Sequence, residues 1–250
     1  MSHPMMAFFD LATTPGQPWK NGAGSTQELA CWPPGAGMDH FAWRLSVATI
    51  ARSGPFSVFP GVQRQIMLLG GDGVHLRHAR GRWEHLLDQR WQPFAFDGDE
   101  PLECRLAGGP STALNLMLRH GLCSGTLQVL HAAPAPETPA AGLCMVLQGL
   151  WQWRGSSGDG DTARALEAGQ GFGWVDQRIE PPGLASAAQH AGAALAWVAL
   201  TGVPSPSAAV RAPSGGRAAL TGVPSPLAAV RAPSGGRAAL VRRPGAGEKT

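Results

Sequence analysis

Hydrophobic and polar residues alternate over short segments of the first 200 residues, as they do in β-strands with one buried face. Residues 41–47 carry Arg44 and Ser46 on one face, and the opposite face takes Phe41, Trp43, Leu45 and Val47. Residues 113–118 place Asn115 on the face opposite three leucines. Further strands are expected at residues 102–106, 126–130, 143–148, 151–154 and 193–200. The pattern predicts an all-β protein.

Glycine-rich turns separate several of these segments. Residues 64–69 and 74–78 flank Gly70-Gly-Asp-Gly73, and this order predicts a hairpin. A strand, a glycine and a second strand recur at 145–154, which suggests two jelly-roll-like halves. Residues 163–168 predict at most one turn of helix, and no long amphipathic helix is apparent. A sandwich or barrel is therefore the expected architecture.

The last fifty residues have a different composition. Residues 199–218 recur at 219–238 with one change, in which Leu227 replaces Ser207. Two copies rich in Pro, Gly, Ser and Ala cannot bury a shared face, so residues 201–250 are predicted to form a disordered tail. The folded domain is expected at residues 8–200.

Charge differs between the two parts of the chain. The net charge of +3 divides into +6 for residues 201–250 and −3 for residues 1–200. A mildly acidic domain with a basic tail gives no indication of a nucleic-acid partner.

A cytoplasmic location without a membrane partner is expected. No apolar run approaches about 18 residues, and residues 1–19 lack the basic and apolar regions of a signal peptide. The cysteines are widely spaced and are expected to be reduced: Cys31, Cys104, Cys123 and Cys144.

Composition makes three polar residues informative. The chain has no Tyr, three Ile, two Asn and two Lys, against 18 Arg, as a GC-rich coding sequence would produce. Under that bias, the retention of Lys20, Asn21 and Asn115 favours a functional role for them.

Three motifs occur in order along the domain. The first is Trp19-Lys-Asn-Gly-Ala-Gly-Ser-Thr-Gln-Glu28, and the second joins Trp43-Arg-Leu-Ser46 to Gly54-Pro-Phe-Ser-Val-Phe-Pro-Gly61. The third is Pro93-Phe-Ala-Phe-Asp-Gly-Asp99, followed by Asn115-Leu-Met117. Together they resemble the HutD/Ves family. The resemblance implies a double cupin (bicupin) over residues 8–200, and a role in sensing or limiting bacterial histidine utilisation.

Three positions depart from the family pattern. Ala23 stands where the family usually has Gly, and Ala113 where an acidic residue is frequent. Arg119 and His120 replace a common pair of arginines. The change at Ala113 weakens any role that needs a carboxylate beside Asn115.

The candidate ligand-binding residues are polar and mostly cationic: Lys20, Asn21, Thr26, Arg44, Ser46, Ser57, Arg64 and Asn115. Arg44 and Arg64 provide guanidinium forks that suit a carboxylate. Phe56, Phe59 and Pro60 are expected to close the barrel end, although they could instead stack on a ligand. The set suits a small anionic metabolite with amide or imidazole character, with a histidine-pathway acid as the suspected partner.

No metal or cofactor is expected. His75 and His78 are the nearest approach to a cupin metal motif, but residues i and i+3 of a strand point to opposite faces. No motif for a catalytic nucleophile is present either.

Three functions remain open. The first is a metal-free binding protein that acts as a sensor or governor. The second is a metal-independent enzyme, in which a buried Lys20 serves as a general base or Schiff-base former. The third is a protein-interaction scaffold with a vestigial pocket. The sequence leaves open whether the protein forms a homodimer.

Overall fold

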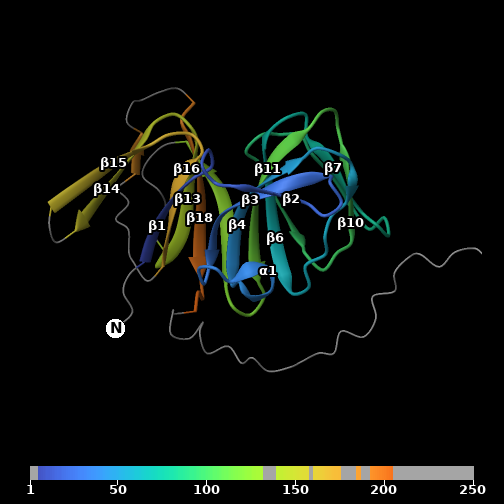
Figure 1. The fold of residues 1–250 in the computed structure, drawn as a ribbon, viewed down its shortest axis with the longest axis horizontal. Helices are drawn as coiled ribbons and strands as arrows, with labels where there is room; N and C mark the ends of the chain where they lie inside the picture. The colour runs from blue at the N-terminus through green and yellow to red at the C-terminus, as the bar shows by residue number, and fades with distance from the viewer. Residues whose placement is uncertain (1–4, 132–138, 158–159, 176–183, 187–191, 205–250) are drawn as a thin grey trace, which may run out of the picture. The chain divides into compact units, whose positions relative to one another are not determined.

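The computed structural model describes residues 5–131, 139–157, 160–175, 184–186 and 192–204 (Figure 1). Strands dominate these residues, and the single helix among them is the short α1 (Gly37–His40). The all-β prediction is confirmed. The predicted disordered tail at 201–250 lies almost entirely outside the described residues.

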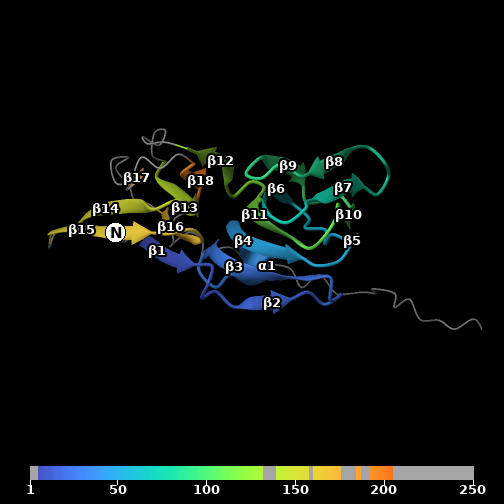
Figure 2. The same cartoon turned by 90° about the horizontal axis from the view of Figure 1, so that it is seen from above.

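A six-stranded antiparallel sheet contains the three sequence motifs. Its strands, in spatial order, are β2 (Gly16–Pro18), β3 (Gly24–Trp32), β4 (Trp43–Ile50), β11 (Ser111–Arg119), β6 (Val62–Gly70) and β9 (Pro93–Asp97). A four-stranded sheet packs against one face of it, in the order β5 (Gly54–Pro55), β10 (Leu102–Leu106), β7 (Val74–His78) and β8 (Glu84–Leu87) (Figure 2). Ile66 and Leu68 of β6 share a buried cluster with Val74 and Leu76 of β7.

A five-stranded sheet forms the centre of the second half. Its order is β1 (Met5–Asp10), β16 (Gln170–Val175), β13 (Ala141–Gln148), β18 (Ala194–Thr201) and β12 (Ser124–Leu130). A three-stranded sheet accompanies it, in the order β15 (Gly160–Leu166), β14 (Trp151–Ser157) and β17 (Leu184–Ser186). Trp151 and Leu166 pack with Phe172 and Trp174 of the five-stranded sheet.

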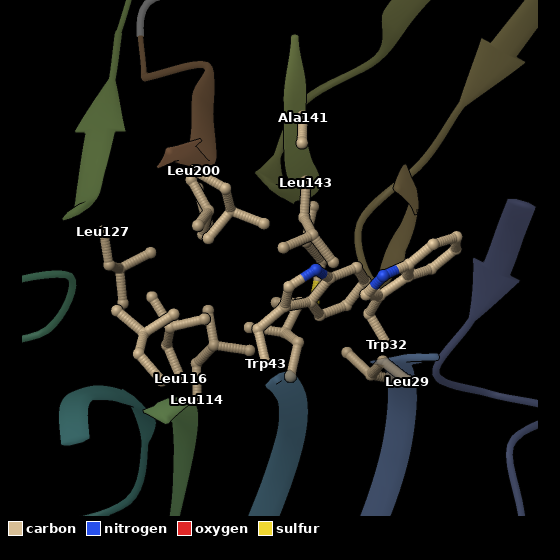
Figure 3. Close-up of a cluster of buried hydrophobic side chains, with 14 of the residues drawn as sticks. Leu29, Trp32, Trp43, Leu114, Leu116, Leu127, Ala141, Leu143 and Leu200 are labelled. Carbon is tan, nitrogen blue, oxygen red and sulfur yellow. The ribbon is translucent and has the colours of Figure 1, made fainter. Parts of the chain in front are cut away.

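The largest buried cluster joins the six-stranded and five-stranded sheets (Figure 3). Its labelled members from the first sheet are Leu29, Trp32, Trp43, Leu114 and Leu116, and those from the second are Leu127, Ala141, Leu143 and Leu200. Alternation along β4 and β11 places Trp43, Leu114 and Leu116 on the face that points toward the five-stranded sheet. The opposite face is left for the residues of the candidate site.

Gln65 adds a polar link between the two sheets. Its side-chain Nε2 donates to the Gly125 carbonyl and its Oε1 accepts from the Leu127 backbone N–H, both over 2.8 Å. Gln65 is buried, and its amide pairs with the backbone of edge strand β12.

The predicted hairpin at residues 64–78 is wrong. β6 pairs with β11 and β9, whereas β7 pairs with β10 and β8 in the other sheet. Gly71 and Gly73 have positive φ angles of 91° and 93°, and a Cβ at Gly71 would meet the Pro110 carbonyl. The glycines let the chain pass tightly from one sheet to the next.

Residues 163–166, for which at most one turn of helix was expected, belong to strand β15. A smaller prediction, on the direction of the Phe41 side chain, is wrong. Phe41 precedes β4 and packs with Val62 and Met117, on the side of the sheet opposite Trp43 and its neighbours.

Candidate functional site

Strand register brings four of the predicted site residues to one face of the six-stranded sheet. On neighbouring strands, Met117 lies between Arg44 and Arg64, and Asn115 lies between Ser46 and Ile66. Ile66 belongs to the cluster shared with the four-stranded sheet, so this face points between those two sheets. Arg44, Ser46, Arg64 and Asn115 are all buried.

Arg64 makes only long hydrogen bonds. Its Nη2 and Nε lie 3.2 Å and 3.4 Å from Asn115 Oδ1, and its Nη1 lies 3.4 Å from the Ser57 carbonyl oxygen. Charged N–H donors usually approach their acceptors to about 2.7–2.9 Å. The guanidinium can therefore form shorter and stronger hydrogen bonds with a charged acceptor.

Three aromatic rings surround the same guanidinium. Its Cζ lies 4.9 Å from the ring centre of Phe96, 5.3 Å from that of Phe59 and 5.5 Å from that of Phe56. Contacts of this kind stabilise a cation in an apolar setting. Phe56 and Phe59 thus hold the Arg64 side chain as well as forming the loop predicted to close the barrel.

Arg64 is a buried cation without a carboxylate partner among the described residues. Only 7% of the residue is exposed, and no described Asp or Glu lies within ion-pair distance of it. Burial, with a further contribution from the positive charge of Arg44, lowers the pKa of Arg64 to about 10. The group is still charged at neutral pH. An uncompensated buried charge is costly, and a bound anion would remove that cost.

Arg44, in contrast, already has an anionic partner. Its Nε donates to Glu28 Oε2 over 2.6 Å, and its Nη1 donates to Ser46 Oγ over 3.1 Å. Glu28 closes the first motif but was not among the predicted site residues. Its proximity follows from the pairing of β3 with β4, which places Glu28 opposite Ser46.

The other residues of the first motif shape a turn. Lys20 is exposed, and Asn21 Oδ1 accepts a hydrogen bond from the Ala23 backbone N–H over 3.0 Å. Thr26 Oγ1 accepts from Trp19 Nε1 over 2.7 Å, and a Cβ at Gly24 would meet the Thr49 carbonyl and the Trp19 ring. No described hydrogen bond or ion pair joins this turn to Arg64.

An aromatic contact nevertheless connects the turn with the Arg64 site. The Trp19 ring meets the Phe56 ring edge-on with centroids 6.4 Å apart, and Phe56 contacts Arg64. Ser57 is exposed and offers Arg64 its backbone carbonyl. The first motif therefore supports the site through packing.

A hollow of about 230 Å³ adjoins the site at Phe59. Its other lining residues are Met38, Val58, Pro60, Val62 and Arg119. Phe59 lines this hollow and also contacts Arg64, so its ring lies between the hollow and the guanidinium contact.

The histidines of β7 lie as the sequence predicted. His78 points into the core with Val74 and Leu76, whereas His75 points outward and lies 3.7 Å from Glu84. Among the described residues, no three His, Cys, Asp or Glu side chains gather as metal ligands would. All four cysteines are described, and none forms a disulfide.

No helix in the described part of the chain is both long enough and apolar enough to cross a membrane.

Comparisons with known proteins agree with the three motifs. A model of the HutD family matches residues 11–195. The Ves proteins of Citrobacter koseri and Escherichia fergusonii are 38% and 35% identical to this chain over 172 residues, which cover 68% of this chain and 84% of each relative. These matches confirm the predicted family resemblance.

Solved structures show the same similarity. A conserved protein of unknown function from Pseudomonas aeruginosa PAO1 is 30% identical with a TM-score of 0.65, covering 78% of this chain and 98% of that one. HutD from Pseudomonas fluorescens SBW25 is 28% identical with a TM-score of 0.62, covering 79% and 98%. Hydroxyethylphosphonate dioxygenase, at 8% identity and a TM-score of 0.57 over 77% of this chain and 78% of that one, shares the fold alone.

Proposed function

Because this chain belongs to the HutD family, we propose that it binds a small carboxylated metabolite and acts as a sensor or governor of bacterial histidine utilisation. The protein is a bicupin of two jelly-roll-like halves, and it needs no metal for this role. The ligand binds in the first half, between the six-stranded and four-stranded sheets.

The buried, uncompensated charge of Arg64 carries the proposal. A carboxylate there would accept two hydrogen bonds from the guanidinium fork and would neutralise its charge. The Asn115 amide lies beside it and supplies a further polar contact. Arg44 is neutralised by Glu28, so its contribution is to orient Ser46 through the hydrogen bond from its Nη1.

The arrangement favours binding over catalysis. An amine that acts as a general base or Schiff-base former needs a desolvated setting, and Lys20 lies exposed on its turn. A scaffold with a vestigial pocket would have no reason to keep an unpaired guanidinium in its interior, since such a charge destabilises the fold.

A thermal-shift screen tests the proposal. The full chain is heated with histidine, urocanate, formiminoglutamate, formylglutamate or glutamate, and the Arg64→Met variant is treated in parallel. Ligand at about 100 times its Kd should stabilise the folded state by about 2.7 kcal/mol. Stabilisation of the wild type alone by one acid supports the proposal, whereas equal shifts in both proteins, or no shift with any acid, contradict it.

A further inference from the structure

The hollow at Phe59 lies on the same face of the six-stranded sheet as the Arg64 site. Met117 lies opposite Arg64 in the register of β11 and β6. Two residues further along each strand, and therefore on the same face, Arg119 lies opposite Val62. Arg119 and Val62 both line the hollow, which has a volume of about 230 Å³. Since β6 begins at Val62 and β11 ends at Arg119, the hollow adjoins the Arg64 site at this end of the two strands.

Three aromatic rings restrict access to the Arg64 guanidinium. Arg64 is 7% exposed, and the rings are those of Phe56, Phe59 and Phe96. Phe96 lies opposite Arg64 in the pairing of β9 with β6 and is itself buried, so the sheet holds it in place. Phe56 packs against the buried cluster between the six-stranded and four-stranded sheets. Phe59 lines the hollow, and neither of the other two rings does. A molecule in the hollow therefore meets Phe59 before it meets Arg64.

The Phe59 backbone is fixed, whereas its ring has room to turn because it borders the hollow. The Phe59 N–H donates to the Gly98 carbonyl over 2.7 Å, and this hydrogen bond anchors the backbone. The residue is half-buried, and its neighbours Val58 and Pro60 are exposed. Side chains at an exposed surface change rotamer rapidly, without any change of the backbone. Rotation of the Phe59 ring can thus open a path to Arg64 while every strand stays intact.

We propose that this hollow is the entrance to the Arg64 site and that the Phe59 ring is the gate between them. The assignment rests on the proposed binding of an acid at Arg64, and it adds how the acid reaches a buried guanidinium. The two phenylalanines of residues 54–61 then have different roles. Phe56 supports the guanidinium from the core side, and Phe59 admits the ligand.

The rate at which a small reagent reaches Arg64 tests this gate. Methylglyoxal is uncharged, is similar in size to a small carboxylic acid and forms covalent adducts with arginine. Peptide mass spectrometry of the full chain gives the rate of adduct formation at Arg64, with the exposed Arg105 as internal standard. The reaction needs no bound acid. Failure of every pathway acid to bind would therefore contradict the proposed function without changing these rates.

Phe59→Ala should raise the rate at Arg64, relative to that at Arg105, by about 10-fold, which corresponds to an opening cost of about 1.4 kcal/mol. Phe56→Ala is the matched comparison. Its ring lies 5.5 Å from the Arg64 Cζ, against 5.3 Å for Phe59, but it does not line the hollow. The acceleration in Phe56→Ala should therefore be several-fold smaller. An equal acceleration in the two variants, or an unchanged rate in Phe59→Ala, would overturn the proposal.

A second pair of variants leaves the rings around Arg64 intact. Met38 lines the hollow and is 42% exposed, so the larger side chain of Met38→Trp should narrow the entrance and slow the modification of Arg64. Leu86 is 48% exposed on β8 and does not line the hollow, so Leu86→Trp should react as the wild type does. Equal rates in Met38→Trp and Leu86→Trp would overturn the assignment of the entrance. This comparison does not depend on the folding of Phe59→Ala.

Discussion

Arg64 and Asn115 lie on neighbouring strands, and Arg64 Nη2 donates to Asn115 Oδ1 over 3.2 Å. The amide oxygen is the only described side-chain acceptor of this guanidinium, although Arg64 is buried and charged. A neutral amide compensates a buried cation less well than a carboxylate does. This relationship explains why an acid would bind here.

Removing the Arg64 charge should stabilise the unliganded protein. Arg64→Met keeps an unbranched apolar side chain among Phe56, Phe59 and Phe96, and it removes an unpaired cation. We expect the free energy of unfolding in urea to rise by about 1–3 kcal/mol. Arg105→Met, at an exposed position of β10, should change it by less than about 0.5 kcal/mol. A loss of stability in Arg64→Met would show that the cation is already compensated.

The difference in unfolding free energy between Arg64→Met and the wild type should depend on pH. The folded-state pKa of Arg64 is lowered to about 10, so the unfolded chain binds more protons between pH 10 and the ordinary arginine pKa. The cost of the charge is therefore fully present below about pH 9 and decreases as pH rises through 10. The stability advantage of Arg64→Met over the wild type should shrink between about pH 8 and pH 11. If the stability gain of Arg64→Met stayed constant or grew over this pH range, the buried charge of Arg64 could not be its cause.

Glu28 should control the charge available to a ligand. Glu28→Gln removes the carboxylate that accepts the 2.6 Å hydrogen bond from Arg44 and leaves two uncompensated guanidiniums on one face. The variant should lose about 1–3 kcal/mol of stability in urea. Its affinity for a carboxylate should increase in calorimetric titration. Glu103→Gln, whose exposed pair with Arg105 spans 3.7 Å, should match the wild type in both measurements.

Gln65 should be required for stable attachment of β12. Gln65→Leu leaves the Leu127 N–H and the Gly125 carbonyl without their side-chain partner. Because both groups were satisfied over 2.8 Å, the loss should be about 2–4 kcal/mol in chemical denaturation. Gln63→Leu, two residues earlier on the same strand, has no such bonds and serves as the control. An equal cost in the two variants would show that the bridge contributes nothing specific.

Much of the fold was predictable because local alternation decides which face of a strand is buried. β10 and β11 follow their predicted alternation, and Leu114, Leu116 and Leu118 enter the large cluster while Ala113 joins the other. The hairpin prediction failed because a glycine-rich turn has the same local pattern whether the chain returns to its own sheet or passes to another. Only long-range strand pairing distinguishes the two outcomes.

In the candidate site, too, local sequence predicted some features, whereas others depended on long-range strand pairing. The three motifs, together with residue type and alternation, selected Arg44, Ser46, Arg64 and Asn115, which the strand register brings to one face. The partnership of Glu28 with Arg44 was not visible, since 16 residues separate them and only the β3–β4 register joins them. Lys20 and Asn21 were predicted to bind the ligand through a cation and an amide. The structure leaves Lys20 exposed on its turn, and the Asn21 side chain accepts a hydrogen bond from the Ala23 backbone N–H within that turn.

Calorimetric titration of the five histidine-pathway compounds into the wild type, Arg64→Met and Arg105→Met measures how much Arg64 contributes to ligand binding. We expect one acid to bind the wild type and Arg105→Met with equal affinity, and its heat of binding to disappear in Arg64→Met. Undiminished binding of that acid to Arg64→Met, or no binding of any of the five to the wild type, would contradict the claim that Arg64 holds the carboxylate of the ligand.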